Sequence, residues 1–339
     1  MKLAVGYQLA KPGTRALTDI VREYASGIAE VSFAWPGEPS GRMPLGLASG
    51  LSLPEVQRQL EADLDVFIGL GVRLNLLLNA SCYGEWAVSE ALADRVGHLV
   101  DYLRRRFGLA VVTTCSPMIA SLVKENFPGV ASRASVNMRI GTTRGAACVG
   151  AFFDEYVLQR EYNRNLAHLG RFKAWSDTNG KKIELLANSG CMAFCPGQTF
   201  HDNLVAHEMQ ASQIRHADFD PSLCRHVYLD PDNWAGILQS TWIRPEDIHH
   251  YEPYCDQIKL ATRMHQDPER VIRAYVERSF SGNLLDLLEP GLGPMLGGRG
   301  LDNAAFPGDW FSVTSACGGE CQRCAYCTGV LKQVLQAAR

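Results

Sequence analysis

The chain has 339 residues, of which 46% are hydrophobic and 20% are charged, and its formal net charge is −3. This composition is typical of a globular protein with a large core, and it excludes a disordered chain. The small negative charge gives no basic footprint, so we expect no nucleic-acid partner. No apolar run approaches the ~18 residues of a spanning helix, and no export signal opens the sequence. We therefore predict a cytoplasmic protein with no membrane contact and with reduced thiols.

Short segments of strand character alternate with segments in which apolar residues recur every three or four positions, as on one face of a helix. The predicted strands are residues 3–8, 30–35, 73–79, 110–115, 131–137, 156–160, 183–188, 241–244 and 258–262. The predicted helices are residues 16–28, 54–70, 86–107, 117–126, 166–177 and 268–280. This alternation predicts an α/β fold with a parallel sheet, and eight strands closing on themselves form a (β/α)8 TIM-like barrel. An open doubly wound sheet is the alternative, but no G-x-G-x-x-G follows the first strand.

A stretch dense in glycine and proline, from Glu289 to Asp309, follows the barrel region. It has no periodicity, which is typical of linkers and wrapping loops. We therefore predict a barrel over residues 1–285, with a cysteine-bearing insertion at residues 189–240. Residues 286–339 are predicted to form the linker and a cysteine-rich extension, which ends in a short helix at residues 329–338.

Two of the 11 cysteines follow the predicted strand at residues 183–188. The turn at residues 188–190 ends that strand and leads to Cys191 and Cys195, whose spacing lets both thiolates bend toward one metal or cluster. Pro196 stops the backbone from folding back, and Cys224 can close the set. The pattern predicts a metal site and favours an iron–sulfur cluster.

The second cysteine group is the most specific signal in the sequence: Cys317-Gly-Gly-Glu-Cys321-Gln-Arg-Cys324-Ala-Tyr-Cys327. The two glycines let the backbone wrap tightly, and the short gaps allow four thiolates to surround one cluster or one zinc ion. Zinc usually prefers two separated pairs, so a [4Fe-4S] cluster is favoured, with zinc as the alternative. The first three cysteines also match the C-x3-C-x2-C motif of radical S-adenosylmethionine enzymes, but that motif normally precedes its barrel.

The other cysteines are isolated in the sequence. Cys82 and Cys115 follow predicted strands and face the predicted barrel mouth, so either one is a candidate to complete a cluster. Cys148 and Cys255 are interpreted as small buried hydrophobic residues. Cys255 also precedes its strand, which places it at the opposite end of the barrel.

Polar residues collect where the predicted strands end, and in a barrel these ends share one mouth. The candidate substrate-binding residues are Asn79, Asn137, Asn188 and Arg263. Arg160 is a candidate catalytic residue that clamps an anion, because an arginine fork suits a carboxylate. His201 and Glu208 fall on one face of a predicted helix, which makes them candidates for proton transfer. For each of these residues alone, the alternative is a structural role in a turn or an ion pair.

Four segments carry a further signal: Ser135-Val136-Asn137, Leu158-Gln159-Arg160-Glu161, Cys191-x-x-x-Cys195-Pro196, and Ile258-Lys259-Leu260 followed by Arg263. Together they resemble the peptidase U32 family, over residues 1–285. Where that family usually has His-Gly at the end of the cysteine-bearing strand, this chain has Ser189-Gly190. The resemblance implies a barrel with a four-iron cluster whose ligands include Cys191, Cys195 and Cys224, and it leaves the fourth ligand open. The family includes collagenase-like proteins and proteins for oxygen-independent hydroxylation of RNA or of quinone precursors, so the resemblance names no substrate.

Three hypotheses about function follow. The first is a redox enzyme with one or two [4Fe-4S] clusters that modifies a small anionic molecule, by oxygen-independent hydroxylation or a related reaction, with an electron-donor protein or partner subunit. The second is a metal-dependent hydrolase or peptidase of the U32 type, although the sequence has no G-x-S-x-G elbow and no H-E-x-x-H helix. The third is a non-catalytic scaffold that binds an iron–sulfur cluster or zinc. A scaffold does not require polar residues that converge at the barrel mouth.

Overall fold

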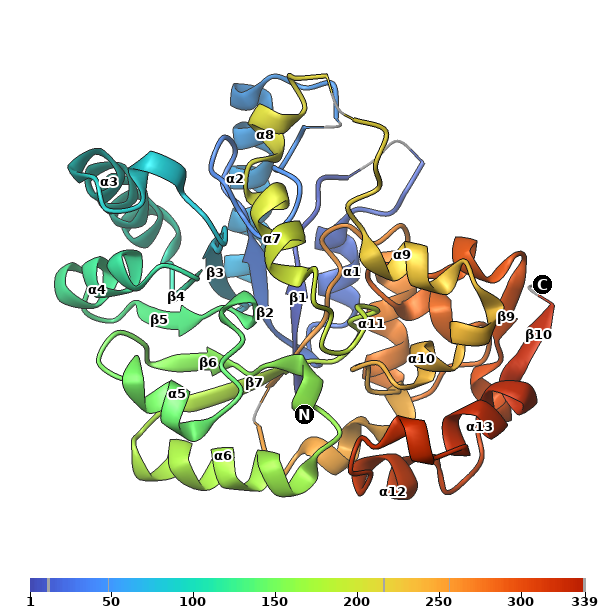
Figure 1. The fold of residues 1–339 in the computed structure, drawn as a ribbon. Helices are drawn as coiled ribbons and strands as arrows, with labels where there is room; N and C mark the ends of the chain where they lie inside the picture. Colours follow the sequence, from blue (N-terminus) through green and yellow to red (C-terminus); the bar gives the residue numbers. More distant parts are fainter. Residues whose placement is uncertain (11–12, 48, 216, 256, 338–339) are drawn as a thin grey trace.

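The computed structural model describes residues 1–10, 13–47, 49–215, 217–255 and 257–337. Eight parallel strands form a closed barrel, in which each strand pairs with the next and β1 pairs with β8 (Figure 1). In chain order they are β1 (Lys2–Gly6), β2 (Ile28–Phe33), β3 (Arg73–Leu78), β4 (Val111–Thr114), β5 (Ala131–Ala134), β6 (Glu155–Val157), β7 (Lys182–Leu186) and β8 (Gln257–Lys259). The predicted (β/α)8 barrel is confirmed.

Helices surround the strands, as the alternating pattern predicts (Figure 1). Those that follow barrel strands are α1 (Leu17–Glu23), α2 (Leu53–Gly69), α3 (Glu90–Phe107), α4 (Pro117–Asn126), α5 (Thr143–Cys148), α6 (Leu166–Thr178) and α11 (Pro268–Glu277). All but α5 have a predicted counterpart. The start of α2 shows why the helix boundaries could be predicted from the sequence. Ser52 and Glu55 form a capping box, and Pro54 lies in the first turn, where its missing N–H costs no hydrogen bond.

The predicted strand at residues 241–244 is wrong, because the structure has no strand there. The segment does reach the sheet: the backbone N–H of Ile243 donates to the carbonyl of Ala187 at 2.8 Å. However, β8 already pairs with this side of β7, with Leu185 opposite Ile258. Because β8 occupies the hydrogen-bonding edge of β7, residues 241–244 pass the end of β7 without joining the barrel.

Two groups of short helices extend the barrel. The cysteine-bearing insertion contains α7 (Gln198–Ala206), α8 (Glu208–Ala211), α9 (Leu223–Tyr228) and α10 (Ala235–Leu238). The C-terminal extension contains β9 (Arg299–Leu301), α12 (Trp310–Ser315), α13 (Tyr326–Val334) and β10 (Leu335–Ala337). The helix predicted at residues 329–338 therefore begins earlier and ends at Val334; residue 338 lies outside the described part of the chain.

The C-terminal extension packs against the insertion rather than standing apart from it. Helix α13 contacts α10, and β10 pairs antiparallel with β9 (Figure 1). The glycine-rich stretch is tied to the barrel as well, because the backbone N–H of Glu289 donates to the carbonyl of Asn188 at 2.9 Å. The two cysteine groups therefore belong to neighbouring parts of one packed region.

The barrel interior contains an ion-pair network in addition to apolar side chains. Arg133, from β5, is almost fully buried, and its Nη2 donates to Glu30 at 2.8 Å while its Nε donates to Glu155 at 2.8 Å. Its Nη1 also donates to Glu184 at 3.3 Å. A buried network of this kind fixes the strands relative to one another, because loss of any one partner leaves a buried charge unpaired.

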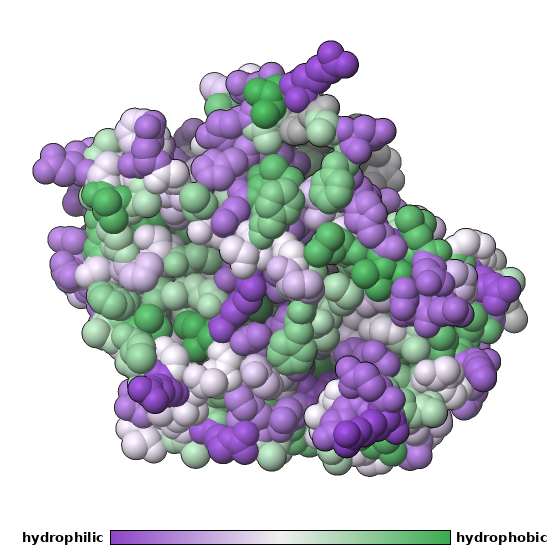
Figure 2. All heavy atoms as spheres, viewed as in Figure 1, coloured by the Kyte–Doolittle hydropathy of each residue, from purple (hydrophilic) through white to green (hydrophobic). Residues whose placement is uncertain are grey.

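No helix in the described part of the chain is both long enough and apolar enough to cross a membrane. Figure 2 shows apolar residues among polar ones over the region of α7 and α9. The large apolar side chains that are exposed in this region include Phe194, Phe200, Phe219 and Leu229.

Candidate functional site

The turn after β7 is fixed by contacts with two other segments. Asn188 is fully buried; its Nδ2 donates to the carbonyls of Ala261 at 3.1 Å and Leu287 at 2.9 Å, and its Oδ1 accepts from the N–H of Ala261 at 2.6 Å. At Gly190, a Cβ would lie 2.2 Å from the carbonyl oxygen of Pro290, so only glycine fits. The amide of Asn188 is thus fully engaged with backbone, which gives this residue a structural role instead of the predicted substrate contact.

Three cysteine thiols lie near one another beyond this turn. Cys191 and Cys195 lie between β7 and α7, and Cys224 lies in α9. Burial, followed by the nearby thiols of Cys191 and Cys195, raises the pKa of Cys224. Burial raises the pKa of Tyr228, one turn further along α9, to about 12, and all three thiols act on it in the same direction. The three predicted cysteines therefore lie within electrostatic range of one another.

Arg160 faces this neighbourhood from the turn after β6. The residue is only 3% exposed, and its Nε has no hydrogen-bond partner within the described residues. Burial acts to lower the pKa of its guanidinium, but Cys191, Glu161, Asp202 and Cys195 outweigh burial and raise it. A buried cation with an unused donor, next to two thiols, suits sulfur ligands that carry negative charge.

His201 and Glu208 are close to each other, but the predicted reason is wrong. Helix α7 ends at Ala206 and α8 begins at Glu208, so the two residues do not share one helix face. His201 nevertheless acts on Glu208: burial raises the pKa of the Glu208 carboxyl, and His201 opposes the shift. Burial lowers the pKa of His201 itself, which leaves its imidazole neutral near pH 7 and able to accept a proton.

Asp202 is a site residue that the sequence analysis did not identify. Its carboxylate lies 3.9 Å from Nη2 of Arg139, and its Oδ2 is buried without a hydrogen-bond partner among the described residues. Its negative charge acts to raise the pKa of Arg160, His201 and Cys115. Asp202 directly follows His201 in the sequence, which was a signal. The sequence analysis, however, considered residues that share one helix face, which recur every three or four positions, and therefore missed the adjacent residue.

The mouth of the barrel encloses a small cavity of about 70 Å³. Three of the four predicted substrate-binding residues line it, namely Asn79, Asn137 and Arg263. Both amides approach the loop between β2 and α2 closely: a Cβ at Gly41 would lie 2.8 Å from Nδ2 of Asn137 and 2.9 Å from Nδ2 of Asn79. The Oδ1 of Asn79 accepts from the Gly41 N–H at 3.0 Å. Glycine at position 41 therefore lets this loop approach the cavity.

The sequence analysis did not assign three further residues of this cavity, Arg42, Lys259 and Glu289. Burial lowers the pKa of Lys259, and burial followed by the nearby Arg42 lowers that of Arg263 to about 9. Neither these two groups nor Arg42 forms an ion pair within 4 Å in the described part of the chain. Burial also raises the pKa of the Glu289 carboxyl, against the effect of Arg42. Cationic side chains thus predominate in the cavity, and their electrostatic complement is an anion.

The isolated cysteines lie in different surroundings. The thiol of Cys115 donates to the carbonyl of Asn79 at 3.3 Å, and burial raises its pKa to about 12. Cys82 is half-buried, and its sulfur accepts from the N–H of Gly84 at 3.4 Å. Cys255 is buried, as predicted. Cys148 is exposed at the end of α5, so its interpretation as a core residue is wrong.

The four cysteines of the C-terminal extension also lie within electrostatic range of one another. Burial, then Cys317 and Cys324, raises the pKa of Cys321. Burial raises the pKa of Cys327 to about 11, with contributions from the other three thiols and an opposing one from Arg164. Cys317 and Cys324 are exposed, and the other two are half-buried.

Arg164 anchors this region to the barrel. Its guanidinium stacks on the ring of Trp242 at 4.3 Å and lies 5.0 Å from the ring of Trp310. Its Nη1 donates to the carbonyl of Leu238 at 2.7 Å, and its Nε and Nη2 donate to that of Trp242 at 3.1 and 3.0 Å. Unlike Arg160, it uses all of its nitrogen atoms.

Within the described residues, no group of three or more His, Cys, Asp or Glu side chains is arranged to hold a single metal ion. A single ion needs its ligands around one point, at about 2.3 Å for zinc and sulfur. A cubane cluster distributes its thiolates over four iron corners. Two observations bear on such a cluster: the thiols of Cys191, Cys195 and Cys224 influence one another electrostatically, and Arg160, whose Nε has no partner among the described residues, is influenced by two of them.

The comparisons with known proteins agree with the resemblance in the sequence. No protein-family model matches the chain. The chain is 24% identical to the uncharacterized protease MJ1657 of Methanocaldococcus jannaschii over 270 residues, and this matched region covers 78% of each of the two chains. Its fold is similar to that of the U32 peptidase Mk0906, with a TM-score of 0.54 and 13% identity over 77% of this chain and 92% of the other. The expected resemblance is confirmed: most of the chain is similar in sequence to an uncharacterized protease, and its barrel fold is similar to that of a U32 peptidase.

Proposed function

We propose that this chain is an iron–sulfur enzyme that modifies a small anionic molecule at the mouth of its barrel by redox chemistry, with oxygen-independent hydroxylation as the model reaction. Cys191, Cys195 and Cys224 are the proposed ligands of a [4Fe-4S] cluster. The observation that carries the proposal is Arg160: a buried guanidinium within electrostatic range of two thiols, with an Nε that lacks a partner among the described residues. Such a cation is costly to bury unless it neutralises negative charge.

Each of the chain's own residues has a role in this proposal. Arg160 neutralises the charge of the sulfur ligands, and the cationic side chains Arg42, Lys259 and Arg263 hold the anionic group of the substrate. His201, which is neutral near pH 7, accepts or returns a proton, Asp202 supports its charged form, and Glu208 is a second proton-transfer candidate that His201 influences. When bound, the cluster supplies one-electron exchange, and an iron corner without a protein ligand would act as a Lewis acid.

The second cysteine group is proposed to hold a second [4Fe-4S] cluster, with zinc as the alternative. Its four thiols influence one another electrostatically, and two of them are exposed, which suits an approach by an electron-donor protein or partner subunit. Arg164 gives this group a fixed position relative to the barrel, because it binds backbone carbonyls and stacks on Trp242 and Trp310.

A peptidase or other metal-dependent hydrolase is the second candidate. It is favoured by the names of two relatives, an uncharacterized protease and a U32 peptidase. A non-catalytic cluster or zinc scaffold is the third, and the predominance of cations in the mouth cavity argues against it, because a scaffold has no use for an anion site at that position.

Anaerobic purification followed by iron, zinc and sulfide analysis and absorption spectroscopy tests the proposal. We expect a brown protein, and we expect Cys191→Ala to remove about four iron atoms per chain. Cys148→Ala is the matched control, because that thiol is exposed and far along the chain from both groups; it should keep all of its iron. A colourless protein that contains only zinc, or full iron content in Cys191→Ala, would exclude the proposed centre. Peptidase activity in the iron-free protein would support the second candidate.

A further inference from the structure

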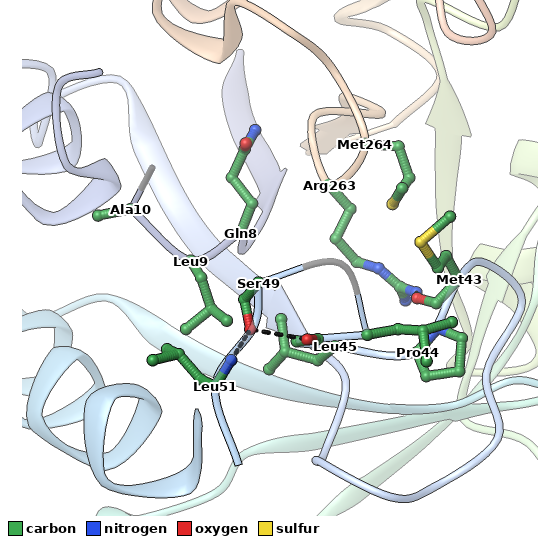
Figure 3. Close-up of a pocket in the computed structure, with 12 residues that line it drawn as sticks. Gln8, Leu9, Ala10, Met43, Pro44, Leu45, Ser49, Leu51, Arg263 and Met264 are labelled. Atoms are coloured by element: carbon green, nitrogen blue, oxygen red, sulfur yellow. Dashed lines mark hydrogen bonds between the residues drawn. The ribbon is translucent and has the colours of Figure 1, made fainter. Parts of the chain in front are cut away.

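A larger and mainly apolar chamber lies next to the mouth cavity. Figure 3 shows residues that line it, and its volume is about 460 Å³. The apolar lining includes Leu9, Met43, Pro44, Leu45, Leu47 and Leu51. This volume is in the range of about 300–1,000 Å³ that small-molecule sites occupy.

The chamber and the mouth cavity share two residues, Arg263 and Met264. The Nη2 of Arg263 donates to the Oγ of Ser40 at 2.9 Å and to the carbonyl of Met43 at 3.2 Å. Figure 3 shows the guanidinium of Arg263 next to Met43. Arg263 therefore holds the loop that forms one wall of the chamber, and it also presents a positive charge at the border between the two spaces.

The character of the lining changes across this border. On the cavity side, Arg42 and Lys259 add positive charge, and no ion pair within 4 Å balances Arg42, Lys259 or Arg263 among the described residues. On the chamber side, Leu47 and Leu51 are each 47% exposed, which leaves apolar surface in contact with water. A ligand that carries both an anionic group and an apolar group would satisfy both sides at once.

We propose that the chamber and the mouth cavity together bind a small anionic amphiphile, with its carboxylate or phosphate held by Arg42, Lys259 and Arg263 and its apolar body in the chamber. The inference rests on the proposed function only for the statement that this molecule is the substrate. Binding itself requires neither iron nor turnover.

Isothermal titration calorimetry with four probes tests the inference on the full chain. Octanoate and octyl phosphate carry both groups, acetate lacks the apolar body, and 1-octanol lacks the charge. Each buried methylene strengthens binding by about fourfold, so octanoate should bind at least 100-fold more tightly than acetate. It should also bind at least tenfold more tightly than 1-octanol. The comparison of octanoate with octyl phosphate identifies the preferred anionic group.

Variants separate the two halves of the site. Leu47→Asn combined with Leu51→Asn should weaken octanoate binding about tenfold and leave acetate binding unchanged. Leu53→Asn is the matched control, because Leu53 is exposed to a similar degree but does not line the chamber; it should bind octanoate as the unmodified protein does. Arg42→Gln should weaken both anions and leave 1-octanol unchanged.

Two results would overturn the inference: equal affinity for octanoate and acetate, or unchanged octanoate binding in the double leucine variant. Both sets of measurements are made on iron-free protein, so they do not depend on the cluster. Tight octanoate binding by a protein that never binds iron would refute the proposed function and leave this inference standing. If the protein binds iron but its iron-free form does not bind octanoate, this inference is refuted and the proposed function stands.

Discussion

Replacement of Arg160 by Met should have opposite effects on the metal-free and iron-loaded proteins. In the metal-free protein, the guanidinium is a buried cation, 3% exposed, with an unpartnered Nε. An unsatisfied buried donor costs about 1–3 kcal/mol. The variant removes this donor, and Asp202 still has Arg139 at 3.9 Å to balance its charge. We therefore expect Arg160→Met to increase the free energy of unfolding of the metal-free protein by about 1–2 kcal/mol.

In the iron-loaded protein, the same substitution removes the positive charge beside the sulfur ligands. Loss of one partner from a buried charge pair costs about 3–5 kcal/mol. We therefore expect the variant to lose most of the iron held by the barrel cysteines. Urea unfolding followed by circular dichroism, on both forms of each protein, gives the free energies, and iron analysis gives the occupancy.

Arg164→Met is the control for this experiment. All of its nitrogen atoms donate to backbone carbonyls, and it stacks on two tryptophan rings, so its loss should destabilise both forms. Two results would refute the reasoning about Arg160: a metal-free Arg160→Met protein that is less stable than the unmodified protein, or an iron-loaded variant with full iron content.

Three further predictions concern the extension, the turn and the barrel interior. Substituting both Cys321 and Cys324 by Ala should remove about one cluster's worth of iron while circular dichroism stays unchanged; loss of all iron would mean that the two cysteine groups serve one site. Gly190→Ala should lower the unfolding free energy by about 2 kcal/mol and reduce iron content, because its Cβ would lie 2.2 Å from a carbonyl oxygen; wild-type stability would contradict this. Burial acts to raise the pKa of Glu30, but Arg133 outweighs burial and lowers this pKa to about 2. About 3 kcal/mol of stability that is present above pH ~4.3 should therefore be lost as the pH falls toward 2. Glu30→Gln should make the unfolding free energy depend less on pH in this acid range.

The fold could be predicted from the sequence because each barrel strand is indicated by the residues of its own segment. Strands such as β3 combine an apolar run with a polar end, and helices such as α2 carry their own caps. The strand predicted at residues 241–244 has the same local character, yet it is not a strand. This segment does not become a strand because β8 already pairs with the adjacent side of β7. That pairing depends on the topology of the barrel and not on the local sequence.

The candidate site was readable only where it lies on strand ends or in compact motifs. Asn79, Asn137 and Arg263 follow strands, and the mouth cavity contains all three. Arg42 lies in a loop rich in glycine and proline, where no periodicity indicates which side chain faces the barrel. Glu289 reaches the cavity because the chain returns to the turn after β7, and its backbone N–H donates to Asn188 at 2.9 Å. Such long-range returns leave no pattern in the sequence.

The structure places positive charge on two sides of the same mouth, and the two sides differ in what they face. Arg160 faces the thiols of the insertion, whereas Arg42, Lys259 and Arg263 face the cavity. Asp202 acts on Arg160 and on Cys115, and the Cys115 thiol donates to the carbonyl of Asn79, which lines the cavity. Electrostatic influence from Asp202 and one hydrogen bond from Cys115 therefore connect the surroundings of Arg160 with the anion cavity. Since an unbalanced buried cation is costly, each of the two cationic groups requires an anion of its own in the proposed function: sulfur ligands for Arg160, and a substrate for the cavity residues.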